Sequence, residues 1–111
     1  MQTLEVAQND IPLNLRANLK YSDDTTVNLS GAAIHFHMRQ IVGGVYTVTP
    51  KVDRACVIET PPGTDGWVYL VWASGDLDTI GRFRGEFQVT FPSGKIVTSN
   101  LVDIIVRQEM A

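Results

Sequence analysis

Two histidines at alternate positions are the residues of this chain best spaced for chemistry. His35 and His37 flank Phe36, and alternate side chains of a strand project from one face, with their Cα atoms about 7 Å apart. Two imidazoles at that spacing can share a zinc ion, but a zinc site needs further ligands. No acidic residue is tied to the pair by local spacing, and the chain has a single thiol, Cys56. We therefore expect no metal site and interpret both histidines as solvent-facing residues on a polar strand face.

The other reactive residue types do not form a catalytic pattern. Neither Cys56 nor any serine lies in a nucleophile elbow, a phosphate-binding glycine loop or a nucleotide fingerprint. Asp76 and Asp78 belong to a short polar segment that lacks the further oxygen ligands of a calcium loop. We predict that the chain is not an enzyme and that it holds no cofactor.

Charge argues against a nucleic-acid partner. The chain has 12 acidic and 9 basic residues, with a net charge of −3, so binding to a phosphate backbone would need a local basic patch. Arg82 and Arg84 alternate along one strand, but Glu86 continues the row with the opposite charge. We interpret this row as a mixed-charge solvent face.

Length and composition are typical of one soluble domain. A chain of 111 residues can bury a self-sufficient core, and the predicted domain covers positions 1–111. One cysteine cannot form an internal disulfide, so a reducing compartment is acceptable. The N-terminal residues do not resemble a signal peptide, and no run approaches the roughly 18 apolar residues of a membrane span. We expect synthesis in a cytoplasm and no membrane partner.

Alternation of apolar and polar residues predicts an all-β fold. It is clearest from Phe83 to Phe91, where Gly85 and Val89 share the parity of the phenylalanines, and Pro92–Gly94 then reverses the chain into two further strand segments, Lys95–Ser99 and Val102–Val106. Other strands are expected at Leu4–Val6, Ile11–Leu19, Ala33–Arg39, Val52–Ile58 and Trp67–Trp72, with a hairpin or a protruding loop at Ile41–Val48 and a loop containing one helical turn at Ala73–Ile80. About seven to nine short strands indicate an antiparallel immunoglobulin-like β-sandwich.

Three segments resemble the N-terminal domain of phage baseplate upper proteins and related tail-associated immunoglobulin-like modules. They are Asn28–Ala32 leading into Ile34–Met38, the strand entry Asp65–Leu70, and Asp76 onward through Gly81–Phe91 with Ser93–Lys95 and Val97–Thr98. In that family the domain is a structural module attached to a receptor-binding or scaffold portion. The resemblance implies a phage or prophage structural protein of the tail or baseplate, located in the virion, made in the host cytoplasm and bound to other tail or baseplate proteins.

The resemblance also orients the strand at Trp67–Trp72. It places one parity inward, namely Val68, Leu70 and Trp72. The opposite parity, Trp67, Tyr69 and Val71, then forms an apolar row on the outer face, where monomeric sandwiches usually carry polar residues. Amphipathic aromatic residues are enriched at the centres of interfaces. We predict that the row mediates self-association or contact with a partner, unless the loop at Ile41–Val48 folds over it.

A function of a different class remains open from the sequence. Trp67, Tyr69 and Tyr46 can be interpreted as the stacking platform of a small carbohydrate- or ligand-binding β-sandwich. Saturable glycan binding that is lost on Trp67→Ala would favour this alternative, whereas concentration-dependent assembly would favour the structural module.

Overall fold

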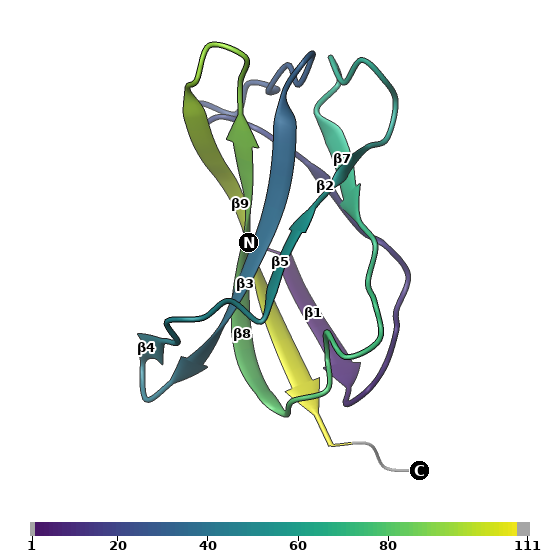
Figure 1. Ribbon diagram of the computed structural model, residues 1–111, viewed down its shortest axis with the longest axis vertical. Helices are drawn as coiled ribbons and strands as arrows, with labels where there is room; N and C mark the ends of the chain where they lie inside the picture. The colour runs from purple at the N-terminus through teal and green to yellow at the C-terminus, as the bar shows by residue number, and fades with distance from the viewer. Residues whose placement is uncertain (1, 109–111) are drawn as a thin grey trace.

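The computed structural model describes residues 2–108, which form nine β-strands and no helix (Figure 1). Met1 and residues 109–111, which the predicted domain includes, lie outside the described part. Within residues 2–108 no helix is long and apolar enough to cross a membrane. The strands are β1 (Gln2–Ala7), β2 (Leu15–Asn18), β3 (Ala33–Val42), β4 (Val45–Tyr46), β5 (Val52–Ala55), β6 (Val57–Ile58), β7 (Trp67–Leu70), β8 (Gly81–Thr90) and β9 (Ile96–Arg107).

The strands form two sheets that pack against each other. The larger sheet has the order β1-β9-β8-β3-β4, with β5 also paired to β3, and the smaller sheet has the order β2-β7-β6. When β2, β3, β6, β7, β8 and β9 are taken as strands B to G, the sheets contain the B-E-D and G-F-C orders of an immunoglobulin-like sandwich. The predicted fold class is therefore confirmed.

One pairing departs from the predicted antiparallel arrangement. β1 runs parallel to β9, from Gln2 opposite Val102 to Ala7 opposite Arg107. The alternation of Leu4 and Val6 identified a strand, but alternation carries no information about which strand lies beside it or in which direction.

The strand predicted over Ile11–Leu19 is wrong in its first half. β2 begins only at Leu15, and the side chains of Ile11 and Leu13 are 60% and 94% exposed. Pro12 has no N–H to donate to a ladder, and this segment carries the chain from the larger sheet to the smaller one. The apolar alternation therefore continues through a connection that pairs with neither sheet.

The strand predicted over Val52–Ile58 is two short strands in different sheets. β5 pairs with β3 and β6 pairs with β7, and the chain changes sheet at Cys56. The Cys56 N–H still donates to the carbonyl of Ile34 in β3, at 2.8 Å. A switch of sheet keeps the side-chain alternation, so the sequence pattern does not reveal it.

The hairpin predicted around Gly43 and Gly44 is confirmed. Val42 in β3 pairs with Val45 in β4, and both glycines have positive φ, 58° and 79°, as a tight turn with two left-handed positions requires. The hairpin projects from the sandwich at the lower left of Figure 1.

The core lies between the two sheets and contains the β8 residues that alternation predicted to face inward. Phe83, Gly85, Phe87 and Val89 are buried, and Phe91 just beyond the strand is half-buried. The ring of Phe36 in β3 lies 5.0 Å from that of Phe87, and its centroid is 6.2 Å from that of Trp72 in an edge-on arrangement. Aromatic residues of β3 and β8 thus fill the centre of the sandwich.

An ion pair anchors the loop that leads into β8. Asp76 is 7% exposed and accepts hydrogen bonds from both terminal nitrogens of Arg54, at 2.7 and 2.8 Å, and from the Ala73 N–H at 2.8 Å. The loop predicted at Ala73–Ile80 is confirmed, but its residues form turns and no helical turn. Burial by itself raises the pKa of Asp76, and the hydrogen bonds from Arg54 and Ala73 outweigh it and hold the pKa below its usual value.

Asp76→Asn is expected to lower the free energy of unfolding at pH 7 by about 2 kcal/mol. Breaking a fully buried pair costs about 3 to 5 kcal/mol, and Arg54 is 36% exposed, so solvent screening reduces the effect. Because the pKa of Asp76 is depressed in the folded state, its contribution is present above about pH 4 and is lost as the pH falls through the folded pKa. Urea unfolding at pH 7 and at pH 3 measures it.

The difference between wild type and Asp76→Asn should therefore shrink at the lower pH. Asp24→Asn is the matched control, since Asp24 is 88% exposed and lies 4.0 Å from Lys20, and it should change stability little at either pH. A difference between wild type and Asp76→Asn that stays constant with pH would show that the ionised carboxylate is not what anchors the loop.

Candidate interaction surfaces

The outer face of the smaller sheet carries the predicted row. Trp67 and Tyr69 in β7 are half-buried and Val71 just beyond it is 48% exposed. The opposite parity, Val68, Leu70 and Trp72, is buried in the core. Val57 in β6 lies directly opposite Tyr69 and is 44% exposed. The row therefore extends sideways onto β6. The sequence did not indicate this extension, because only strand pairing brings Val57 beside Tyr69.

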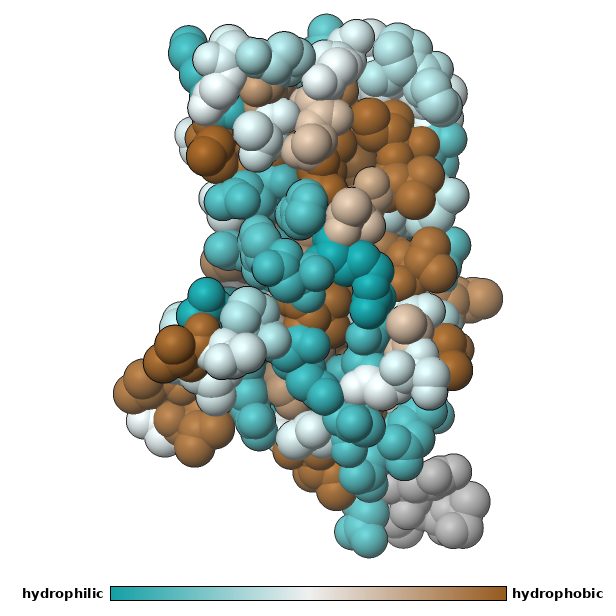
Figure 2. All heavy atoms as spheres, viewed as in Figure 1, coloured by the Kyte–Doolittle hydropathy of each residue, from teal (hydrophilic) through white to brown (hydrophobic). Residues whose placement is uncertain are grey.

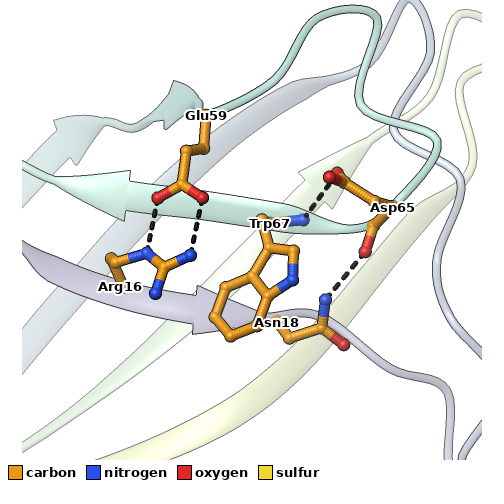
Figure 3. A network of polar contacts seen from close by, with 5 residues as sticks. All are labelled: Arg16, Asn18, Glu59, Asp65 and Trp67. Atoms are coloured by element: carbon orange, nitrogen blue, oxygen red, sulfur yellow. Dashed lines mark hydrogen bonds and ion pairs between the residues drawn. The ribbon is translucent and has the colours of Figure 1, made fainter.

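A bidentate ion pair lies beside Trp67, at one end of the row (Figure 3). Arg16 in β2 donates to both carboxylate oxygens of Glu59, from Nε at 2.5 Å and from Nη2 at 2.6 Å. The guanidinium carbon lies 4.2 Å from the centre of the Trp67 ring, within the range of a cation–π contact. The guanidinium covers one face of the indole, so Val57 and Val71, each close to half exposed, are the more open part of the surface beside the half-buried Tyr69.

The hairpin does not cover this row. Its backbone belongs to the larger sheet, and Arg39 fixes it by donating to the carbonyls of Thr47 and Val48 at 3.1 and 2.8 Å. β4 and β7 lie at opposite corners of the molecule in Figure 1. The covering role considered for Ile41–Val48 is therefore wrong.

The three aromatic residues of the predicted stacking platform are likewise separated. Trp67 and Tyr69 lie on the smaller sheet, whereas Tyr46 lies on the hairpin of the larger sheet. A common platform built from Trp67, Tyr69 and Tyr46 is therefore not present.

The two histidines share a carboxylate on the outer face of the larger sheet. Asp53 in β5 is opposite His37, and its Oδ1 lies 3.1 Å from Nδ1 of His37 and 3.5 Å from Nδ1 of His35. This neighbour comes from strand pairing and not from local spacing, which is why the sequence did not show it. In residues 2–108 the histidine, cysteine, aspartate and glutamate side chains form no group of three or more that could hold a metal ion.

Cys56 lies half-buried at the point where the chain changes sheet. Burial raises the pKa of its thiol to about 12, against a smaller opposing effect of Arg54. The thiol is therefore protonated near neutral pH, and the nucleophilic thiolate is scarce.

The arginine row on β8 is neutralised by a residue from the neighbouring strand. Asp103 in β9 lies 3.1 Å from Nη2 of Arg84 and 3.4 Å from Nη2 of Arg82. The side chain of Glu86, the predicted neutralising charge, makes no hydrogen bond or ion pair with any residue of the described part. The mixed-charge face is present, but Asp103 supplies the counter-charge.

A hollow of about 350 Å³ opens on the same face, between the hairpin and β9. Its lining residues are His37, Arg39, Tyr46, Arg84, Gly85, Glu86 and Leu101. Figure 2 shows the tip of the hairpin as a hydrophobic projection beside a largely hydrophilic face. The hollow thus lies where an apolar arm meets a polar sheet surface.

Comparisons with known proteins do not assign the chain to a family. No family model matches it, and no curated protein matches it. Among solved structures, it is similar to "Drosophila OTK, extracellular domains 3-5", with 12% sequence identity and a TM-score of 0.34. The similarity covers 98% of this chain and 33% of that chain, so the chain spans about a third of its length. The strand order, and not this similarity, identifies the fold.

Proposed function

We propose that this chain is a structural module of a phage or prophage tail or baseplate, acting through contacts with other tail or baseplate proteins or with further copies of itself. The observation that carries the proposal is the apolar surface of Tyr69, Val57 and Val71 on an outer sheet face. The resemblance of three segments to tail-associated immunoglobulin-like modules supplies the tail or baseplate context. In this role the chain lies in the virion after synthesis in the host cytoplasm, holds no cofactor and catalyses no reaction.

The composition of this face suits a protein contact. Interface centres are enriched in aromatic residues and arginine and are surrounded by polar residues that exclude water. Here Val57, opposite Tyr69 on β6, and Val71, two residues beyond Tyr69, are close to half exposed. Arg16, opposite Tyr69 on β2, pairs with Glu59 beside Trp67. Because the ion pair is already formed within the chain, a partner can cover it without ordering a free arginine side chain.

Tyr69→Glu is expected to disperse the assembly and to leave the fold intact. A carboxylate placed in an apolar contact would lose its hydration without gaining a partner. Size-exclusion chromatography with light scattering should show a mass that rises with concentration for the wild type and a monomer for the variant. Thr90→Glu, at an exposed position on the larger sheet, is the matched control and should assemble like the wild type.

Other results would change the proposal in defined ways. A wild type that remains monomeric at high concentration excludes self-association through this row. The remaining form of the proposal is then a contact with a different tail protein, which predicts co-purification from cells that express the neighbouring tail genes and its loss on Tyr69→Glu. If Tyr69→Glu lowers the melting temperature without any effect on mass or co-purification, the row serves only the stability of the fold.

A further inference from the structure

A β-bulge shapes the hollow on the outer face of the larger sheet. Gly85 pairs with Val102 and Phe87 pairs with Ser99, so two consecutive β9 residues, 100 and 101, stand opposite Glu86 alone. Such bulges locally bend a strand and redirect its side chains, and they are frequent beside functional sites. Leu101, in the bulge, is 42% exposed and lines the hollow. The bulge thus gives the hollow an apolar wall on the outer face of the sheet.

The arginines of the hollow are held by the protein itself. Arg84 donates to Asp103 at 3.1 Å and to the hydroxyl of Tyr46 at 3.1 Å. Arg39 is fixed by the two carbonyls at the base of the hairpin. These bonds also orient the Tyr46 ring, which is 47% exposed. The hollow therefore presents an aromatic ring and two guanidinium groups in fixed positions.

Glu86 is the polar group of the hollow whose bonding capacity is unused. The residue is half-buried, and its side chain makes no hydrogen bond or ion pair within residues 2–108. An ionised carboxylate can accept about four hydrogen bonds, and leaving these unmade in a partly enclosed site is unfavourable. Hydroxyl donors of a ligand would satisfy them.

Charged groups of both signs line the hollow. Arg39 and Arg84 are positive and Glu86 is negative, while Asp103 beside the hollow pairs with both Arg84 and Arg82 and His37 faces Asp53 from the neighbouring strand. A phosphate would meet the carboxylate of Glu86, and an amine would meet the two guanidinium groups. A neutral ligand that both donates and accepts hydrogen bonds avoids this repulsion.

We propose that the hollow binds a neutral saccharide unit, with Glu86 accepting from its hydroxyl groups and the Tyr46 ring packing against its apolar C–H face. A volume of about 350 Å³ lies at the small end of ligand sites and suits one sugar ring. This binding is a further activity, at a site on the other sheet from the apolar row. It does not use Trp67, unlike the stacking platform predicted from the sequence.

The test is an NMR titration of ¹⁵N-labelled protein with the methyl glycosides of glucose, galactose and N-acetylglucosamine. At least one should cause saturable shifts at the amides of Tyr46, Arg84 and Glu86, with a dissociation constant on the order of 1 mM. Glu86→Gln should weaken binding by about tenfold, the effect of losing hydrogen bonds to a charged acceptor. Tyr46→Ala should weaken it further, and Trp67→Ala should leave it unchanged.

Two outcomes would overturn the site. One is the absence of saturable shifts around the hollow with all three glycosides at concentrations up to about 50 mM, far above the expected dissociation constant. The other is binding that persists unchanged in Glu86→Gln, whose retained spectrum would show that it is folded. Neither result bears on the assembly, because Tyr69→Glu acts on the opposite sheet, and so the two proposals fail separately.

Discussion

Replacing Phe87 by alanine is expected to lower the free energy of unfolding by about 3 to 5 kcal/mol. The side chain is fully buried, and its ring packs 5.0 Å from that of Phe36. Truncation removes apolar surface from the core and leaves a cavity between the sheets, into which the surrounding close-packed side chains relax only in part. The midpoint and slope of urea unfolding give the change.

Thr90→Ala on the same strand provides the comparison. Thr90 is exposed at the end of β8, so its truncation should change stability by less than about 0.5 kcal/mol. If Phe87→Ala costs no more than this control, Phe87 does not contribute to the core and the packing of β8 against the smaller sheet is wrong.

Sequence alternation predicted the buried faces well because burial acts on each strand separately. Phe83 and Phe87 point into the core whichever strand lies beside β8, because the alternation of side chains follows from backbone geometry alone. This prediction needs only local sequence. The outward orientation of Tyr69 came instead from the sequence resemblance, because its strand is apolar on both faces.

Pairing could not be predicted in the same way, because it depends on residues far apart in the chain. Asp53 reaches the histidines only through the register of β3 with β5, and Arg16 reaches Glu59 across the smaller sheet, at a separation of 43 residues. The predicted strand over Ile11–Leu19 shows the opposite error, since apolar alternation continued before Leu15 through a connection that pairs with neither sheet. The sequence therefore pointed to the central residues of the candidate surfaces, whereas the residues around them are known only from the structure.

Gly85→Ala is expected to destabilise the protein by about 3 kcal/mol, at the upper end of the usual cost of overpacking a core. A Cβ at Gly85 would lie 2.2 Å from Cζ of Phe36 and 2.6 Å from its Cε1, far inside contact distance. The Phe36 ring cannot retreat freely, because the rings of Phe87 and Trp72 pack against it. Glycine is needed at this position because the Phe36 ring occupies the space that a Cβ would take. Urea unfolding measures the loss.

A double-mutant cycle with Phe36→Leu identifies the cause. Leucine lacks the atoms that the new Cβ would meet, so Gly85→Ala should cost less in the Phe36→Leu background than in the wild type, with a coupling of at least about 1 kcal/mol. Gly94→Ala is a contrasting glycine variant, because a Cβ there meets nothing within 4 Å and its cost comes from a φ of 89° alone, which Phe36→Leu should not relieve. Additive effects of Gly85→Ala and Phe36→Leu would instead mean that the phenylalanine ring moves aside without cost, and that the glycine is not required by the packing of β3 against β8.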